Sequence, residues 1–476
     1  MYRIMIITIL DANFSQTNQP KLLRVNDFSF KKEFYRKSRY QIKRQEYDSY
    51  IVNTDGIFLT GLLPKIIQYC RDNNINYEVT TNPKAPQSII PQEISPLFEL
   101  REDQKTCVQA ALNTDRGVIK APTGSGKTVL IAAIISTFPE ARILFLCHTL
   151  SLLKQTQKEF NKYDIGPSSI IGGSKKDIDG RIVISTVQSF SKPTLLDNFY
   201  DKFDVVFIDE AHHCRTTSGL YARVLTKLTV SRRYGTTATM PTDQEGLLAL
   251  EGLIGPKIAE LTIEDAIEKE ILAIPHIELI PVPFCEAIRD IRKYADTKMK
   301  DDYGKFILDE NGENIIESGI YTTAIVEYRK RNRLIIEKAI EKNKIGESVL
   351  IYIINIDHGE RLMQIAKLMG MNPIFIRGSS DSELREKTRQ ALNNKEILTT
   401  IATVAWAEGV NIRNLDCILL AGGGKSITAL IQKIGRGLRR TETKTKATII
   451  DCLDSGRYIS EHCIERLKVY AEKGWL

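Results

Sequence analysis

The chain has 476 residues, of which 42% are hydrophobic and 26% are charged. This is the composition of a soluble globular protein that is long enough for two or three hydrophobic cores, and it contains no low-complexity tract or internal repeat. The formal net charge of +7 favours a polyanionic partner, although such a charge is also common in proteins that bind none.

The eight cysteines are scattered, without a Cys-x-x-Cys pair or a histidine at zinc spacing. We interpret them as small buried residues in a reducing compartment. The apolar residues 1–10 are followed by no cleavage site, so a first strand is expected there instead of a signal peptide. No apolar run reaches the roughly 18–20 residues of a membrane span. We therefore expect a soluble protein of the cytoplasm.

Residues 1–95 are predicted to form a small N-terminal α+β module that binds nucleic acid, with a helix at 62–70 and a proline-containing connector at 82–96. Basic and aromatic residues alternate in it between Lys21 and Arg44. The basic residues are Lys21, Arg24, Lys31, Lys32, Arg36, Lys37, Arg39, Lys43 and Arg44. Such side chains can neutralise phosphates while aromatic rings stack on unpaired bases. The alternative is a β-hairpin whose aromatic residues form the module's core.

From residue 116 onward, short β-branched runs alternate with longer helical stretches, which predicts doubly wound parallel sheets. The first series of strands is expected at residues 117–120, 143–147, 182–185, 205–208 and 234–237. The second is expected at 348–354, 373–376, 399–402, 417–420 and 447–450. The sequence thus predicts an α/β protein with two domains in tandem, at 96–255 and 336–476. Prolines and a turn-like segment at 309–314 predict a linker or insertion at 256–335.

A glycine-rich segment, Ala121-Pro-Thr-Gly-Ser-Gly-Lys-Thr128, lies between a predicted strand and a predicted helix at 129–136. In this context glycines allow backbone N–H groups to converge on phosphate oxygens, and the helix N-terminus adds its dipole. Lys127 would neutralise the β- and γ-phosphates and Thr128 would bind Mg²⁺. A chance glycine-rich turn is the alternative. The predicted nucleotide contacts are Pro122, Thr123, Gly124, Ser125, Gly126, Lys127 and Thr128.

An acidic pair follows the predicted strand at 203–208, in the segment Asp209-Glu-Ala-His212. Its carboxylates would emerge at the carboxyl edge of the sheet, where open α/β sheets bind their ligands. Asp209 can hold Mg²⁺ and Glu210 can deprotonate the attacking water. An acidic helix cap is the alternative, and the phosphate loop upstream makes it the poorer interpretation.

Near the C-terminus, Arg436 and Arg439 are three residues apart in the segment 432–440 and would share one face of a helix. A basic helix face is usually solvated or bound to nucleic acid. The other interpretation is that both arginines are directed at one nucleotide, because phosphoryl transfer needs charge stabilisation.

These three motifs, in this order, resemble those of superfamily 2 helicases, and the resemblance extends over residues 96–476. It implies two RecA-like domains that hydrolyse ATP with Mg²⁺ while moving along nucleic acid. Leu100-Arg-Glu-Asp-Gln104 is similar to the family's adenine-reading motif, which implies that Arg101 and Gln104 contact ATP. Gly409 is implied as a further nucleotide contact, and Gln432 as a catalytic residue with Lys127, Glu210, Arg436 and Arg439.

The same resemblance implies roles outside the nucleotide site. The residues implied to contact nucleic acid are Thr149, Thr186, Gln188, Gly378 and Thr403. His212, Thr237 and Thr239 are implied to couple the domains. Arg331-Asn-Arg333 resembles the start of the second domain. Leu146-Cys-His-Thr149 departs from the family's pattern, which leaves the nucleic-acid contact of that motif in doubt.

Within the superfamily, the Leu-Arg-x-x-Gln opening, the Gly-Arg-Gly-Leu-Arg segment and Arg466-Leu-Lys-Val-Tyr470 look most like those of XPB-related DNA helicases. The N-terminal module, with Gly56-Ile-Phe-Leu-Thr-Gly-Leu-Leu63, looks like that of UvsW-type phage helicases, which remodel branched DNA. The resemblance implies a monomeric ATP-dependent motor that unwinds or branch-migrates forked and junction DNA in replication, recombination or repair. An RNA helicase and a restriction-type translocase of double-stranded DNA are the alternatives.

Overall fold

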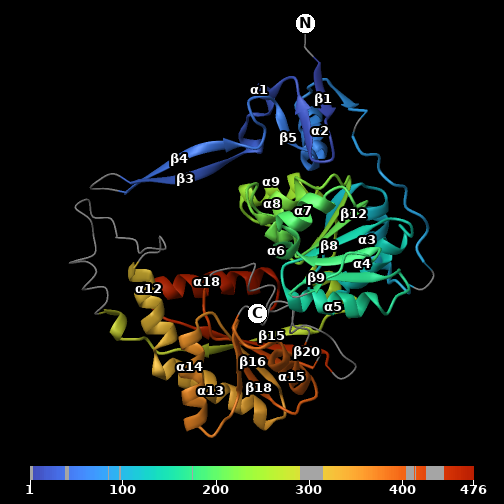
Figure 1. Cartoon of the computed structure of the whole chain (residues 1–476). Coiled ribbons are helices and arrows are strands. Elements are labelled where there is room, and N and C mark those ends of the chain that lie inside the picture. Colours follow the sequence, from blue (N-terminus) through green and yellow to red (C-terminus); the bar gives the residue numbers. More distant parts are fainter. Residues whose placement is uncertain are drawn as a thin grey trace. The chain divides into compact units, whose positions relative to one another are not determined.

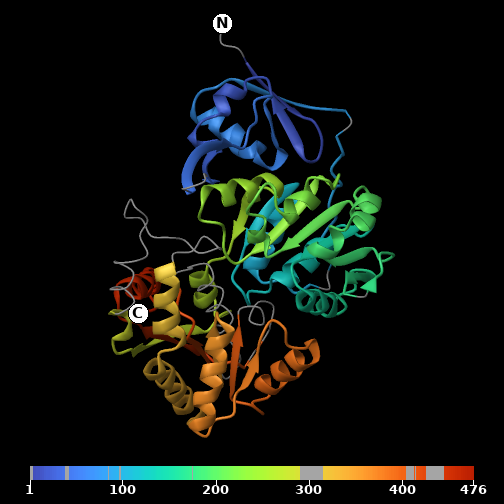
Figure 2. The same ribbon diagram turned by 60° about the vertical axis from the view of Figure 1, so that its left-hand side comes forward.

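The computed structural model describes residues 4–37, 42–83, 85–95, 98–173, 175–289, 315–403, 412, 414–424 and 444–476. The chain divides near residue 262 into two compact units, coloured blue to yellow-green and yellow to red in Figures 1 and 2. All eight cysteines are buried and free, as expected from their scattered positions. None of the helices in the described ranges is both long and apolar enough to cross a membrane.

The first unit begins with a four-stranded sheet of order β5-β2-β1-β6, in which β1 is parallel to β6 and antiparallel to β2. Helix α2 (Leu63–Asp72) packs against this sheet through Ile66 and Cys70. The other elements are β1 (Met5–Ile9), β2 (Phe14–Thr17), α1 (Pro20–Leu23), β5 (Ile57–Leu59), the 3₁₀ turn η2 (Thr60–Leu62) and β6 (Tyr77–Thr81). This part of the chain is called the N-terminal module below.

Strands β3 (Ser29–Lys37) and β4 (Ile42–Tyr50) of the N-terminal module form a separate antiparallel hairpin. The strands pair from Ser29 and Tyr50 as far as Lys37 and Ile42. At its base, Phe28 and Phe30 are buried in the core of the module. These two aromatic residues therefore form part of the module's core, as expected if the aromatic residues of this segment serve packing instead of base stacking. The hairpin extends away from the four-stranded sheet (Figure 1).

The N-terminal module packs on helix α9 (Gln244–Leu253) of the following domain through two glycines. A Cβ atom on Gly61 would lie 2.2 Å from the carbonyl oxygen of Glu251, and one on Gly252 would lie 2.8 Å from Leu59 Cδ1. Such distances are too short for any side chain, so η2 and α9 approach each other backbone to backbone. Leu59 also belongs to the core of the following domain.

Two arginines strengthen this attachment, Arg233 with a buried side chain and Arg116 with a partly buried one. Arg233 is fully buried and donates to Asn13 Oδ1 of the module and, over 3.1 Å, to the carbonyl of Leu253. Arg116 donates to the carbonyl of Ala12. Burial lowers the pKa of Arg116 to about 10 and that of Arg233 well below its usual value, and their mutual repulsion adds to the effect on Arg233. Because a buried guanidinium must have its N–H groups satisfied, the module supplies acceptors that the domain needs.

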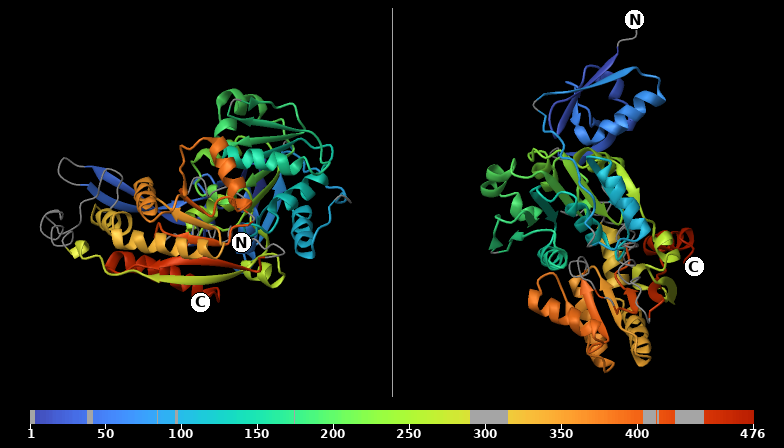
Figure 3. Two further views of the ribbon diagram at one scale, coloured as in Figure 1. Left: turned by 90° about the horizontal axis from the view of Figure 1, so that it is seen from below. Right: turned by 90° about the vertical axis from the view of Figure 1, so that its right-hand side faces the viewer.

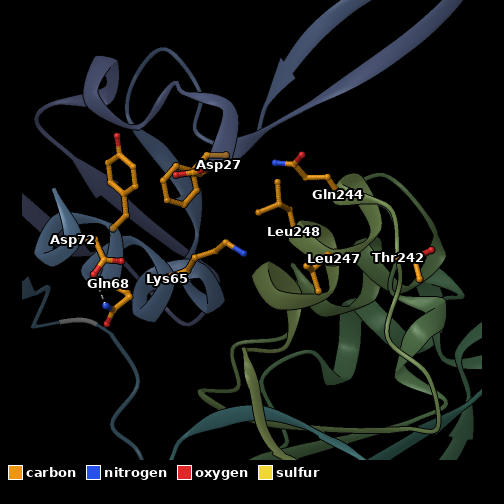
Figure 4. Close-up of a pocket in the computed structure, with 10 residues that line it drawn as sticks. Asp27, Lys65, Gln68, Asp72, Thr242, Gln244, Leu247 and Leu248 are labelled. Carbon is orange, nitrogen blue, oxygen red and sulfur yellow. Dashed lines mark hydrogen bonds between the residues drawn. The ribbon is translucent and has the colours of Figure 1, made fainter. Parts of the chain in front are cut away.

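Helices α2 and α9 also line a cavity of about 410 Å³ (Figure 4). Lys65, Gln68 and Asp72 line it from the module, and Gln244 and Leu248 line it from α9. Lys65 Nζ forms an ion pair with Glu251 Oε2 of α9 at 2.9 Å. The contact between module and domain is therefore tight at the two glycines and open where α2 and α9 carry polar side chains.

The rest of the first unit is a doubly wound sheet of eight strands, in the order β10-β9-β11-β8-β12-β13-β7-β14. All neighbours are parallel except β10 and β9. The strands are β7 (Arg116–Lys120), β8 (Ile143–Cys147), β9 (Ser168–Gly172), β10 (Lys175–Lys176), β11 (Ile182–Thr186), β12 (Val205–Asp209), β13 (Arg232–Thr237) and β14 (Lys257–Glu260). The five strands predicted for this domain are confirmed within two residues at each end. The short β9 and β10 were not predicted.

Helices flank this sheet (Figure 3), and its central strands are buried along nearly their whole length. The helices are α3 (Glu102–Leu112), α4 (Lys127–Ser136), α5 (Leu150–Phe160), α6 (Val187–Phe190), α7 (Pro193–Phe199), α8 (Leu220–Leu225) and α9. Continuous β-branched and aliphatic runs such as Ile143–Cys147 are typical of strands covered on both faces. Because these strands are parallel, the carboxyl ends of β7, β8, β11, β12 and β13 lie at one edge of the sheet.

The second unit is built on a six-stranded, fully parallel sheet of order β15-β20-β19-β16-β18-β17. Its strands are β15 (Ile274–Pro281), β16 (Val349–Ile353), β17 (Ile374–Ile376), β18 (Thr399–Thr403), β19 (Cys417–Leu420) and β20 (Lys446–Leu453). Its helices include α10 (Ile263–Glu268), α12 (Ile315–Tyr321), α13 (Arg329–Lys344), α14 (Ile356–Leu368), α15 (Ser382–Asn393) and α18 (Arg457–Glu472). The five strands predicted here are confirmed, and the prediction of an α/β protein with tandem parallel sheets is correct.

The prediction of an irregular linker at 256–335 is wrong over its first part. Strand β14 pairs with β7 in the first sheet, and β15 pairs with β20 in the second. The prolines that suggested irregular structure, Pro275 and Pro281, lie in β15, which is an edge strand of its sheet. A proline is tolerated there because one side of an edge strand needs no backbone N–H for pairing.

Candidate nucleotide site

The phosphate loop joins β7 to α4 at the carboxyl edge of the first sheet. Gly124 and Gly126 have φ values of 92° and 93°, which side-chain-bearing residues rarely adopt. A Cβ atom on Gly126 would also lie 2.7 Å from Gln104 Nε2. Helix α4 begins at Lys127, and Leu130 and the five residues after it are buried, which anchors the helix in the domain. The sequence thus folds into a glycine loop that opens on a helix N-terminus.

Gln104 lies in the first turn of α3, next to this loop. Its Oε1 accepts a hydrogen bond from the backbone N–H of Arg101, the N-cap residue of α3, at 3.2 Å. Arg101 in turn donates to both carboxylate oxygens of Asp103, over 3.1 and 3.0 Å. The start of α3 is therefore fixed by its own side chains, and Gln104 is held against the phosphate loop at Gly126.

The acidic pair lies at the end of β12. Asp209 Oδ1 accepts hydrogen bonds of 3.0 Å from Thr236 Oγ1 and from the backbone N–H of Glu210. Burial raises the pKa of the Asp209 carboxyl, the nearby charge of Glu210 raises it further, and Lys127 acts in the opposite direction. Glu210 itself has a left-handed backbone, with φ 51° and ψ 52°. A non-glycine residue in this conformation is held by its surroundings, and such residues cluster at functional sites.

Glu210 lies between a lysine and a histidine. Its Oε1 is 4.0 Å from Lys127 Nζ, and its Oε2 is 3.5 Å from His212 Nδ1. His212 Nδ1 is also 3.0 Å from Thr237 Oγ1. The Thr237 hydroxyl donates to the carbonyl of Thr239 and accepts from the N–H of Thr239. Because the hydroxyl proton is used there, His212 Nδ1 must be the donor to Thr237, which fixes the tautomer of the ring.

This arrangement fits a nucleoside triphosphate. Lys127 Nζ is buried and has no hydrogen-bond partner among the described residues, which suits an ammonium group that awaits an anion. Gly124 and Gly126 have a left-handed backbone that side-chain-bearing residues rarely adopt, and the missing Cβ of Gly126 lets Gln104 approach the loop. Thr128 follows Lys127 in the first turn of α4, and Asp209 provides a carboxylate at the end of β12, which is separated from β7 by β13 alone. These two side chains are the oxygen donors that a divalent cation would find here.

Three residues implied to contact nucleic acid lie at helix starts of the same domain. Thr149 is the N-cap of α5 and accepts from the N–H of Leu152 at 3.3 Å. Thr186 is the N-cap of α6 and accepts from the N–H of Ser189 at 3.3 Å. Gln188 in the first turn of α6 is exposed. Both threonines thus have a structural function at a helix terminus, and the side chain of Gln188 is accessible to a ligand.

Other predicted residues lie elsewhere. Gly378 follows β17 and accepts through its carbonyl from the Arg385 guanidinium, and Thr403 is buried at the end of β18. Arg36 and Lys37 belong to β3, and the structure describes only the backbone of these two residues. The predicted residues that fall outside the described part of the chain are Arg39, Gly409, Gln432, Arg436 and Arg439.

Sequence reasoning missed three residues of the site. Thr236 donates to Asp209, and the ring of His213 lies between those of His212 and His148, with centroids 4.3 and 4.4 Å away. Thr236 could have been found, because it precedes Thr237 at the end of a strand adjacent to β12. No pattern in the sequence predicts the contact between His148 and His213, because these residues come from different strand ends of the sheet.

Residues 97–242 match the family described as the res subunit of type III restriction enzymes, and residues 330–441 match the helicase conserved C-terminal domain. The protein named as helicase 22 of a Sulfolobus islandicus filamentous virus is 27% identical over 379 residues, which are 75% of this chain and 64% of its own. The ATP-dependent DNA helicase uvsW of Enterobacteria phage T4 is 23% identical over 497 residues, covering 94% of this chain and 92% of its own.

Among solved structures, that of the helicase MrfA bound to DNA is similar over 81% of this chain and 53% of its own, with a TM-score of 0.56 and 17% identity. At this identity the likeness is one of fold, and it agrees with two parallel sheets in tandem. Each family match covers most strands of one of the two parallel sheets, and the first includes both the phosphate loop and the Asp209-Glu-Ala-His212 segment. The chain therefore belongs to the superfamily 2 helicases, which are ATP-dependent motors on nucleic acid.

Proposed function

We propose that this chain hydrolyses ATP to move along DNA and that it remodels forked or branched DNA. The observation that carries the proposal is the meeting of Lys127, Asp209 and Glu210 at one edge of the first sheet, with Lys127 Nζ buried and Glu210 Oε1 at 4.0 Å from it. A cation that can bind phosphate thus lies beside a carboxylate that can accept a proton from water.

In this proposal each residue has one task. Lys127 and the N–H groups of the loop bind the phosphates, Thr128 and Asp209 hold Mg²⁺, and Gln104 with Arg101 contacts the adenine. Bound Mg²⁺ would neutralise charge that develops on the phosphates. Glu210 accepts the proton of the attacking water and His212 orients Glu210, while His212, Thr237 and Thr239 couple the nucleotide site to the movement of the domains. The family resemblance also gives Gly409 a nucleotide contact and Gln432, Arg436 and Arg439 catalytic roles.

DNA as the substrate is supported by the relative from phage T4, which is named an ATP-dependent DNA helicase and matches nearly the full length of this chain. We propose that Thr149, Thr186, Gln188, Gly378 and Thr403 contact the DNA strand. The N-terminal module would read the fork through Arg36, Lys37 and Arg39, whose positive charges can neutralise DNA phosphates. Viral relatives favour a role in viral replication or recombination, in an infected cell.

A second candidate, translocation on double-stranded DNA without strand separation, is favoured by one observation. The first domain matches the res subunit family of type III restriction enzymes. Displacement of a third strand from a triplex reports translocation alone, whereas separation of a fork also requires unwinding. Triplex displacement without fork unwinding would favour this second candidate.

The proposal is tested by ATPase assays with single-stranded DNA, forked DNA, four-way junctions and RNA side by side, together with unwinding assays on the same substrates. We expect the largest stimulation by forked and four-way DNA. Stimulation by RNA alone would contradict the choice of DNA. Light scattering after gel filtration, with and without DNA, tests whether the motor is a monomer.

The role of the hairpin is best tested in the full chain, because the module supplies Asn13 to the buried Arg233 and its removal would disturb the first domain. Arg36→Glu combined with Lys37→Glu should weaken binding to forks and reduce its salt dependence, because fewer counterions are released. Lys175→Glu with Lys176→Glu is a matched control, since these exposed lysines lie on β10 at the sheet edge. An equal loss of affinity for forked DNA in both double variants would show a general effect of charge, and the hairpin would then have no specific role in fork binding.

A further inference from the structure

The strand end that departs from the helicase pattern carries His148, which the proposed function leaves without a role. Its ring lies 4.4 Å from that of His213, with 46° between the planes. The ring of His213 lies 4.3 Å from that of His212, with 35° between the planes. A third neighbour, Tyr221, is stacked nearly parallel to His213 at 6.3 Å. Three imidazoles therefore form a continuous line, called the histidine line below.

The histidine line ends at the hydrolytic carboxylate. His212 Nδ1 is 3.5 Å from Glu210 Oε2 and 3.0 Å from Thr237 Oγ1, and its tautomer is fixed by the Thr237 hydroxyl. The opposite end is His148, at the carboxyl end of β8, one residue before the N-cap of α5. No group of three or more metal-ligating residues with suitable geometry occurs in the described ranges, so the line is not a metal centre there.

Glu210 needs such support because its backbone is left-handed, with φ 51°. A residue in this conformation is strained and persists only where the surroundings determine it. His212 orients the carboxylate, and the ring of His213 packs against that of His212. Contacts between aromatic rings favour one ring orientation over another.

We propose that His148 and His213 are positioning residues for Glu210: the ring of His148 packs at a tilt on that of His213, His213 packs at a tilt on His212, and His212 holds the carboxylate. The inference rests on the proposed function only in that Glu210 activates water. A displacement of a reacting group by about 1 Å can cost roughly a hundredfold in rate, so loss of the stack reduces turnover without removing any residue that touches ATP.

The test compares His213→Ala with His213→Phe, which keeps a stacking ring. His213→Ala should lower kcat of DNA-stimulated ATP hydrolysis about tenfold or more and change KM for ATP less than about threefold, whereas His213→Phe should stay near the wild-type kcat. His148→Ala and His148→Phe should follow the same order with smaller effects. His276→Ala, which removes an exposed histidine on β15, is the control. Wild-type turnover in His213→Ala, or equal losses in the Ala and Phe variants, would overturn the proposal.

A second readout does not depend on activity. The chain has only six histidines, so ¹⁵N-histidine NMR can resolve the ring of His212. The wild type and His213→Phe should show His212 protonated at Nδ1, and His213→Ala should show an averaged ring signal because the ring is no longer held. An unchanged His212 signal in a folded His213→Ala protein would contradict the positioning role. If the wild type did not hydrolyse ATP, the proposed function would be wrong. The NMR signal of His212 would still show whether His213 holds the His212 ring.

Discussion

Lys127 Nζ lies 4.0 Å from Glu210 Oε1, at a distance that allows attraction but no hydrogen bond. Both side chains are largely shielded from solvent, at 11% and 14% exposure, so their charges act on each other through little water. The two side chains carry the two tasks that we propose for the site: Lys127 binds phosphate and Glu210 activates water. The first two predictions separate these tasks.

Lys127→Ala should abolish ATP turnover, with a loss of at least about a hundredfold, because no other cation of the loop can replace the ammonium. ATP hydrolysis stimulated by single-stranded DNA measures this. Lys162→Ala, at an exposed ion pair with Glu159, is the matched control and should hydrolyse ATP like the wild type. Near-normal turnover of Lys127→Ala would falsify the assignment of the phosphate loop.

Glu210→Gln should bind ATP with affinity close to that of the wild type and hydrolyse it slowly, because the amide has a similar shape but cannot accept the proton. Binding of a fluorescent ATP analogue and single-turnover hydrolysis measure the two steps separately. If binding and hydrolysis fell in parallel, Glu210 would serve metal binding or local structure instead.

Gly61→Ala should loosen the N-terminal module from the first domain, because the added Cβ would lie 2.2 Å from the carbonyl oxygen of Glu251. Overpacking of this kind costs about 1–3 kcal/mol. Hydrogen exchange followed by mass spectrometry should show faster exchange in α2 and α9 and unchanged exchange in α13 and α14. Lys65→Ala, which removes only the partly exposed ion pair with Glu251, is the control and should change little. Unaltered exchange in Gly61→Ala would mean that η2 is not pressed against α9.

His358 should make the second unit less stable in mild acid. Burial lowers the pKa of this histidine to about 3, and the charges of Arg331 and Arg361 act in the same direction. Between pH 3 and the ordinary value of 6.5, the unfolded chain therefore binds a proton that the folded chain does not. Stability is complete above about pH 6.5 and falls by up to about 1.4 kcal/mol for each pH unit below it.

The variant His358→Gln removes this titration and can keep a donor to Asn332 Oδ1, which accepts from His358 Nε2 at 2.9 Å. Urea unfolding of the full chain at pH 7.5 and pH 5 should show a smaller loss in His358→Gln than in the wild type, whatever the variant does to stability at pH 7.5. His276→Gln, on an exposed edge strand, should keep the wild-type loss. Equal losses in all three proteins would show that His358 is not responsible.

The sequence by itself determined the two parallel sheets and the residues of the phosphate loop. Strands such as β8 and β19 are continuous apolar runs whose bounds follow from composition, and the glycines before Lys127 leave few other conformations. Local spacing also placed Asp209 and Glu210 at a strand end. In each case the information lies within a few neighbouring residues.

Only the tertiary structure decided which distant residues meet. The proline-containing β15 became a strand because it pairs at a sheet edge. Thr236 joined the site because β12 and β13 are neighbours, and His213 meets His148 because β12 and β8 are neighbours. The attachment of the N-terminal module depends on Gly61 and Gly252, which lie far apart in the sequence, and no sequence pattern links them. Such contacts arise from packing between elements, whose geometry no local spacing encodes.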